Sequence, residues 1–169
     1  LAETDFEDFK KVLNSALEEL NRHREEEGAM LEKDLYKRIT NINAQEEKIV
    51  HLEPNRIKRI REEIVQLLET YAGKENYDGN RLEQELIYYI EKIDIHEEQV
   101  RLKQHCDYFK TLLADKDESK GKKLSFIIQE IGREINTTGS KAYDAEIQKC
   151  VVIMKDELEK AKEQVLNVL

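Results

Sequence analysis

The 169-residue sequence contains few residues that break or cross-link a chain. It has one proline, six glycines, two cysteines and no tryptophan, and aromatic residues make up 7% of it. The scarcity of proline, together with 38% charged residues, favours long exposed helices over a compact β-rich globule. No stretch is apolar enough to span a bilayer. Cys106 and Cys150 match no metal-binding spacing, so we expect both to be reduced and buried, as in a cytosolic protein.

Negative charge dominates the composition, but one region is basic. The formal net charge of −9 argues against a general coat for nucleic acid. Residues 119–141, however, carry five basic residues against two acidic ones, a local excess of three positive charges that suits a phosphate site. The chain opens with LAETDFEDFK, without an initiator methionine or a signal peptide, so we expect it to be a fragment of a longer protein.

Apolar residues recur at helical spacing along the first half of the chain. Thr4 and Glu7 have capping-box spacing, which predicts a helix from Thr4 to about Leu52. Pro54 fits the first turn of a second helix, because proline is tolerated at that position. The run AGKENYDGN, residues 72–80, is a turn-rich break.

The second half continues the helical pattern. A third helix is expected from Asn80 to about Leu113, and a fourth begins near Lys122 and is interrupted or kinked at NTTGS. The last helix carries the apolar residues from Ile147 to Val165. The pattern predicts an all-α fold of long antiparallel helices forming a helical hairpin or bundle. We expect a long helical hairpin at residues 1–75 and a helical C-terminal region at residues 76–169.

The run HREEEG, residues 23–28, is the first of three polar clusters. Arg24 and Glu27 occupy positions where the apolar seam of the first helix should continue, and Gly28 permits close approach of another backbone. The alternative is a solvated stretch of a long helix with local ion pairs.

The second cluster is DIHEEQVRLKQH, residues 94–105. Asp94, Glu98, Arg101 and His105 are spaced four, three and four residues apart, so they line one helical stripe, which Glu97 flanks. Two carboxylates at i, i+4 repel each other unless a cation lies between them. Arg101 as that cation gives a structural ion-pair network, whereas Mg²⁺ or Mn²⁺ gives a metal site with hard oxygen ligands.

The third cluster is QEIGREINTTGSK, residues 129–141. Glu130 and Glu134 repeat the i, i+4 carboxylate pair, and two such pairs that face each other suit one or two metal ions, as in phosphoryl-transfer sites. Residues 137–140 offer hydroxyl and backbone N–H groups at an expected helix start, which favours an anion. The alternative is an ordinary helix-to-helix turn with a serine cap.

These clusters resemble the YicC/YloC-like endoribonuclease family of bacteria. The matching runs are RHREEEGAML, RLEQELIYYIEKIDIHEEQVRLKQH, GKKLSFIIQEIGREINTTGSKA and VVIMKDELEKAKEQVLNV. Membership implies a cytoplasmic, divalent-metal-dependent protein that cleaves RNA, forms a homo-oligomer, a hexamer at full length, and has an N-terminal domain with β structure before this region. Ser125 departs from the family's usual aspartate, which removes one potential metal ligand or cap.

The resemblance also implies that the three clusters form one polar site, built by at least three helices. Arg24, Glu27 and Gly28 match its first motif. The expected catalytic residues are Glu98, Arg101, His105, Glu130, Arg133 and Glu134, with His105 as proton carrier. The expected RNA-binding residues are Arg24, Lys122, Lys123, Gln129, Asn136, Thr137, Ser140 and Lys141. The expected ligands of Mn²⁺ or Mg²⁺ are Asp94, Glu97, Glu98, Glu130 and Glu134.

The sequence therefore predicts a metal-dependent endoribonuclease, or its helical part, that acts on single-stranded or structured RNA. The alternative is an RNA-binding or oligomerisation module without activity of its own. A purely structural scaffold is disfavoured, because it would place leucine or isoleucine where the seams are polar. If the second and third clusters are facing walls of one RNA site, side chains of residues 98–105 must lie close to those of residues 130–134.

Overall fold

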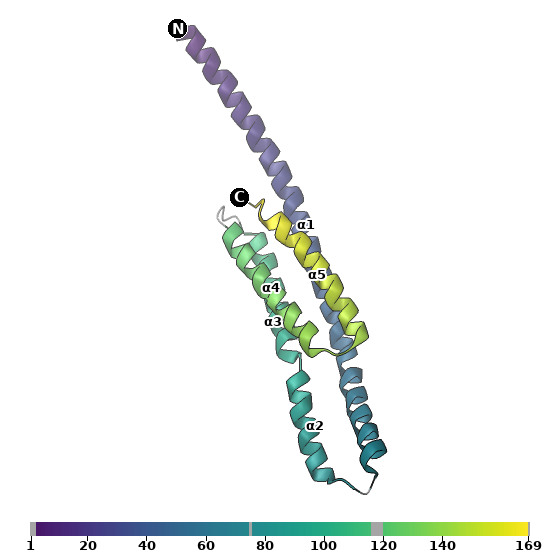
Figure 1. The fold of residues 1–169 in the computed structure, drawn as a ribbon. Helices are drawn as coiled ribbons and strands as arrows, with labels where there is room; N and C mark the ends of the chain where they lie inside the picture. The colour runs from purple at the N-terminus through teal and green to yellow at the C-terminus, as the bar shows by residue number, and fades with distance from the viewer. Residues whose placement is uncertain (1–2, 75, 116–119, 169) are drawn as a thin grey trace.

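The computed structural model describes residues 3–74, 76–115 and 120–168, in which five helices and no strands are found. These are α1 (Glu3–Ala72), α2 (Gly79–Ile93), α3 (His96–Leu113), α4 (Gly121–Lys141) and α5 (Ala145–Val165). In Figure 1, α3, α4 and α5 lie beside the middle of α1, and α2 runs along its last part. The all-α prediction of long antiparallel helices is thus confirmed. The proposed division at residue 75 stays a prediction.

The core lies where α1, α3, α4 and α5 meet. Leu35, Ile39, Ile42 and Ile49 from α1 are almost fully buried, and they share one face because they recur every three to four residues or one heptad apart. The other helices contribute aliphatic residues at the same spacing and one buried aromatic ring, Phe109. Residues 6–30 of α1 contact none of this core and project from the bundle as a single exposed helix (Figure 1).

The expected second helix at Pro54 is wrong, because α1 continues through Pro54 to Ala72. A proline inside a helix removes one backbone hydrogen bond, which tertiary contacts on either side can offset. Here Arg56 is buried and donates to Glu53 and to the Ile93 carbonyl at 2.8 Å, so the helix is held just beyond the proline. The hairpin expected within residues 1–75 is therefore not formed, and the chain reverses direction only after α1 ends at Ala72.

The expected third helix is two helices. The N-cap of the first, α2, is Asp78, whose carboxylate accepts from the Asn80 N–H at 2.9 Å. The cap expected at Asn80 therefore lies two residues earlier. The helix then ends at Ile93, and α3 begins at His96. Asp94 has extended backbone and its side chain accepts from the His96 N–H at 3.1 Å, a local alternative to the helical hydrogen bonds. Ile95 at this joint is fully buried.

Helix α4 runs through NTTGS without interruption, so the expected break there is also wrong. The glycines serve close packing instead. A Cβ atom at Gly132 would lie 3.0 Å from Leu158, and one at Gly139 would lie 3.0 Å from Val151. A side chain at either position would press against α5, so these glycines favour the close approach of α4 to α5. The predicted last helix is confirmed as α5.

Both cysteines are free thiols and buried, as expected. Burial raises the pKa of Cys106 to about 12 and also raises the pKa of Cys150. Neither thiol is therefore an activated nucleophile at neutral pH.

Candidate functional site

Helices α3 and α4 meet along a seam of charged side chains. At one end Lys141 Nζ lies 2.8 Å from Glu98 Oε1. In the middle Arg101 Nη1 lies 3.8 Å from Glu134 Oε1. At the other end His105 lies beside Glu130 and Glu134. The approach of residues 98–105 to residues 130–134, expected from the sequence, is confirmed.

His105, Glu130 and Glu134 form the one group among the described residues with the geometry of a metal site. One ligand atom from each residue lies within 4.8 Å of the others. Glu134 is 3% exposed, whereas His105 and Glu130 are half-buried, so the group opens to solvent on one side. Two carboxylates and an imidazole are a donor set that divalent transition metals accept.

Two arginines flank this group. Arg101 is paired with Glu97 on its own helix and with Glu134 across the seam, and its side chain is 44% exposed. Arg133 Nη1 lies 3.9 Å from Glu130 Oε2, and its side chain is 72% exposed. Both guanidinium groups therefore lie next to the carboxylates and within reach of an anion from solvent.

Glu98 is the most enclosed carboxylate of the α3 stripe. Its side chain is 6% exposed, and Oε1 accepts from Lys141, but Oε2 finds no hydrogen-bond partner among the described residues. Lys141 also donates to the Asp94 carbonyl at 3.1 Å. This pair joins the last turn of α4 to the joint between α2 and α3.

Three of the expected metal ligands lie outside the group of His105, Glu130 and Glu134. Asp94 accepts from the His96 N–H, Glu97 pairs with Arg101, and Glu98 pairs with Lys141. Their side chains thus have local partners, and their assignment as ligands stays a prediction. His105 was assigned to proton transfer from the sequence, and its place beside two carboxylates gives it the geometry of a ligand.

The remaining predicted residues are spread over the molecule. Arg24, Glu27 and Gly28 lie on the projecting part of α1, where nothing lies within 4 Å of a Cβ atom built at Gly28. Within this one chain they do not join the α3–α4 seam, so the expected three-helix site is built by two helices here. Lys122 and Lys123 lie in the first turn of α4, and Gln129, Asn136 and Ser140 are exposed along the same helix.

The hydroxyls of NTTGS do not lie at a helix start, which corrects the expected anion site. They are in the last turns of α4, where Thr137 donates to the Arg133 carbonyl at 3.0 Å and Ser140 donates to the Thr137 carbonyl at 2.9 Å. The α4 end is closed by Gln148, whose side-chain amide donates to two carbonyls, those of Gly139 and Ala142. The hydroxyls of Thr137 and Ser140 therefore satisfy backbone acceptors, whereas Thr138 Oγ1 is buried without a hydrogen-bond partner among the described residues.

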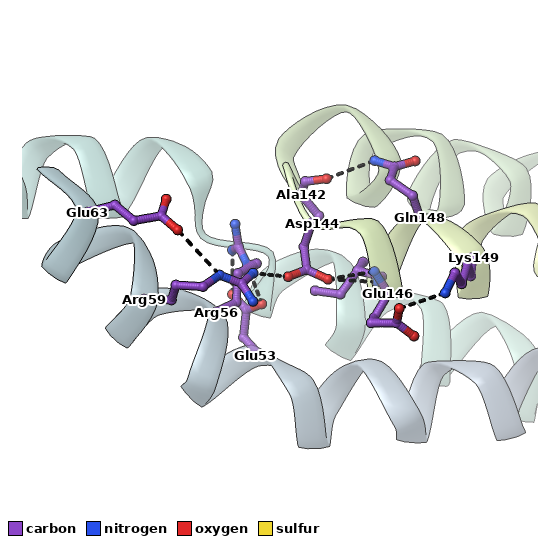
Figure 2. Close-up of polar contacts among 10 residues, drawn as sticks. Glu53, Arg56, Arg59, Glu63, Ala142, Asp144, Glu146, Gln148 and Lys149 are labelled. Atoms are coloured by element: carbon purple, nitrogen blue, oxygen red, sulfur yellow. Dashed lines mark hydrogen bonds and ion pairs between the residues drawn. The ribbon is translucent and has the colours of Figure 1, made fainter. Parts of the chain in front are cut away.

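A second polar network, missed from the sequence, joins α1 to the α2–α3 joint and to the start of α5. Figure 2 shows Arg56 against Glu53, and Arg59 reaching Asp144. Burial alone would raise the pKa of Asp144, but hydrogen bonds from the Ile147 N–H and from Arg59 outweigh it and hold the pKa below its usual value. Both arginines belong to the basic run RIKRIR, residues 56–61. The signal that was missed is the seven-residue step from Ile49 to Arg56, which keeps Arg56 on the buried face of α1.

No helix among the described residues is both long and apolar enough to cross a membrane. The chain is similar to known proteins over nearly its whole length. It is 37% identical over 161 residues, 95% of the chain, to a protein of Clostridioides difficile (strain 630) named "Probable endoribonuclease YicC". It is 31% identical over 162 residues, 96% of the chain, to a protein of the same name from Haemophilus influenzae. In both cases the chain spans 55% of the relative's length.

A family model agrees with these two similarities. The model described as "Endoribonuclease YicC-like, C-terminal" matches residues 49–169, which include the α3–α4 seam and the Arg56 network. The resemblance seen in the sequence motifs is thereby confirmed, and the chain belongs to the YicC-like endoribonuclease family.

Proposed function

We propose that this chain is the helical part of a metal-dependent endoribonuclease, and that His105, Glu130 and Glu134 hold its divalent cation. The observation that carries the proposal is the convergence of these three ligand atoms within 4.8 Å, although His105 precedes Glu130 by 25 residues and lies on another helix. The names of the two relatives support RNA as the substrate.

The chemistry of the group fits Mn²⁺ better than Mg²⁺. Carboxylates bind either ion, but imidazole is a ligand for transition metals, and Mg²⁺ is usually held by oxygen atoms alone. When bound, such a cation polarises a phosphoryl oxygen and lowers the pKa of a bound water. The half-buried positions of His105 and Glu130 leave one side of the group accessible to substrate.

The arginine side chains beside the group have a role separate from that of the metal ion. Arg101 and Arg133 orient the scissile phosphate, because guanidinium groups bind phosphate oxygens through two parallel hydrogen bonds. They also stabilise the additional negative charge that develops during attack on phosphorus. Lys141 was assigned to RNA binding from the sequence, and this assignment stays a prediction. Its contacts to Glu98 and to the Asp94 carbonyl favour a role in holding the seam together.

Calorimetric titration with Mn²⁺ tests the metal site directly. Glu134→Gln removes one charged ligand but preserves the size of the side chain, and we expect Mn²⁺ affinity to fall at least about tenfold. Glu159→Gln is the matched control, since Glu159 pairs with Lys162 on the exposed face of α5, away from the group. Unchanged Mn²⁺ affinity in Glu134→Gln would refute the assignment.

Cleavage is tested on a radiolabelled RNA with one hairpin and one unpaired tail, in the presence of Mn²⁺ or Mg²⁺. Both the 169-residue chain and the full-length gene product are assayed, because the relatives are longer than this chain. We expect cleavage by the full-length protein and its loss in Glu134→Gln. Normal cleavage by that variant would place the chemistry elsewhere and leave the seam as an ion-pair network.

A second candidate function is assembly or RNA binding without activity of this region alone. One observation favours assembly: the projecting part of α1 exposes a continuous apolar stripe. Its members, each about half exposed or more, are Phe6, Phe9, Val12, Leu13, Leu17 and Leu20. A lone helix gains nothing from such a stripe in water, and we propose that a second copy of the chain covers it in a homo-oligomer.

A further inference from the structure

Two exposed aromatic residues lie about one helical turn along α3 and α4 from the candidate metal group. Tyr108 on α3 is 55% exposed, and Phe126 on α4 is 62% exposed. An exposed aromatic ring in a helix is not needed for folding. Its surroundings therefore indicate what it would bind.

The antiparallel pairing of α3 with α4 places Tyr108 and Phe126 toward the same end of the group along the helix axes. Lys141 pairs with Glu98, and Glu134 pairs with Arg101, so later residues of α4 lie opposite earlier residues of α3. The C-terminal end of α3 therefore lies next to the N-terminal end of α4. Tyr108 follows His105 by three residues and Phe126 precedes Glu130 by four, which is about one helical turn in each case.

Phe126 also lines a shallow hollow on the surface. The hollow lies between the first half of α4 and the end of the chain, and its lining includes Lys122, Ser125, Gln129 and Leu166. A planar ring, a cation, an amide and a hydroxyl are the groups that bind a nucleotide: stacking on the base, attraction for the phosphate and hydrogen bonds to the base edge.

We propose that Phe126 and Tyr108 form a stacking site for an unpaired RNA base next to the phosphodiester at the His105 group. The proposal rests on the proposed function and names its substrate class: RNA that is single-stranded at the cleavage position. One turn of α4, about 6 Å along its axis, separates Phe126 from Glu130, so one nucleotide can reach both. Bases inside a duplex present no free face, so paired RNA cannot use this site.

The composition of the exposed stripe of α4 distinguishes RNA from a protein partner. Phe126 is the one apolar member of this stripe, whose other members are Lys122, Gln129, Arg133, Asn136 and Ser140. Protein interfaces have apolar centres depleted of charged residues, as the projecting part of α1 would provide. A single ring among cations and amides instead suits a base between phosphates.

The test is RNA binding in EDTA, where metal-dependent cleavage is stopped, measured by fluorescence anisotropy with the full chain. The probes are an unpaired 10-mer, the same 10-mer with one abasic nucleotide, and a blunt duplex. Phe126→Ala and Tyr108→Ala are compared with Phe126→Trp, which restores a stacking surface. Tyr71→Ala is the control, since Tyr71 is 84% exposed in the last turn of α1.

We expect each alanine variant to weaken binding of the unpaired 10-mer about 5- to 100-fold. Phe126→Trp should restore affinity, and duplex binding should not change. The difference between variant and parent should shrink with the abasic probe. Mn²⁺ affinity should be unchanged in all of them, which separates this site from the metal group.

Equal affinity of all variants for the unpaired 10-mer overturns the stacking site, even if Glu134→Gln loses Mn²⁺ and the proposed function stands. Loss of self-association in Phe126→Ala, with RNA affinity unchanged, assigns the ring to a protein interface and also overturns it. If the aromatic variants lose RNA affinity while Glu134→Gln keeps Mn²⁺ affinity, the metal assignment fails and the stacking site stands. A chain that binds none of the probes refutes the stacking site.

Discussion

Lys141 Nζ donates to Glu98 Oε1 at 2.8 Å, and so closes a loop of 43 residues between the last turn of α4 and the first turn of α3. The two partners are unequal, because the Glu98 side chain is 6% exposed and that of Lys141 is 32% exposed. Glu98 therefore depends on Lys141 for most of the compensation of its buried charge.

Lys141→Met should destabilise the chain by about 2–4 kcal/mol, because removal of one partner leaves the other charge buried and uncompensated. The double variant Glu98→Leu/Lys141→Met should recover most of that loss. Urea denaturation followed by circular dichroism measures both. Lys160→Met is the control, since it breaks an exposed pair with Asp156 and should cost less than about 1 kcal/mol. Equal effects of the two single variants would contradict the buried-pair account.

Asp144 should contribute stability that depends on pH. Its pKa is lower in the folded chain than in the unfolded chain, so its contribution is present above about pH 4 and disappears as pH falls through the folded-state pKa. Asp144→Asn retains a side-chain acceptor for the cap of α5 but loses the charge that pairs with Arg59. It should be less stable than the parent at pH 7, and the difference in stability should shrink as the pH falls below about 4. A difference that persists unchanged at pH 2 would show that the charge is irrelevant.

Asp144→Ala removes the cap as well. It should cost about 1–2 kcal/mol at pH 7, because the N–H groups of Glu146 and Ile147 lose their acceptor. Thermal unfolding of the alanine and asparagine variants side by side separates the cap from the ion pair. If both variants unfold at the same temperature at pH 7, the cap contributes nothing beyond the charge.

Glu46 should have the opposite pH dependence. Burial against the core raises its pKa, and Lys103 opposes this only in part. A carboxyl group with a raised folded-state pKa lowers stability once the pH rises through that pKa. Glu46→Gln should therefore raise the unfolding temperature at pH 8 and leave it unchanged near pH 4, as measured by differential scanning calorimetry. A lower unfolding temperature at pH 8 would show that the charged form is stabilised by a partner.

The apolar stripe on the projecting part of α1 should drive self-association. Replacing Phe9, Leu13 and Leu17 together by serine removes three large exposed side chains without touching the core. Multi-angle light scattering after gel filtration should show a lower mass for this variant than for the parent chain. The control replaces Lys11, Asn14 and Glu18 on the opposite face by serine and should preserve the parent mass. A parent chain that is monomeric at high concentration would contradict this prediction.

The sequence predicted the helical class, because it follows from local periodicity. The approach of α3 to α4 was expected from the matching i, i+4 carboxylate pairs and from the family resemblance. A spacing of four, three and four residues fixes one face of a helix whatever surrounds it. The sequence did not predict the continuity of α1 through Pro54 or the joint at Asp94, because contacts from elsewhere in the chain decide both. Arg56 shows this, since its acceptor, the Ile93 carbonyl, lies 37 residues away. His105 was assigned by its typical pKa, whereas its neighbours on α4 give it a ligand's position.

Helix α1 contributes one face to the core and also extends far beyond it. Seventy helical residues span about 105 Å, and about 40 Å of that length lies beyond the bundle. Leu13 and Leu35 are 22 residues apart, close to six whole turns, so the stripe that faces the core and the exposed stripe share one line along the helix. A rotation of only a few degrees where α1 meets α3 and α5 therefore moves the far end by several ångströms. Any partner held there is displaced in proportion.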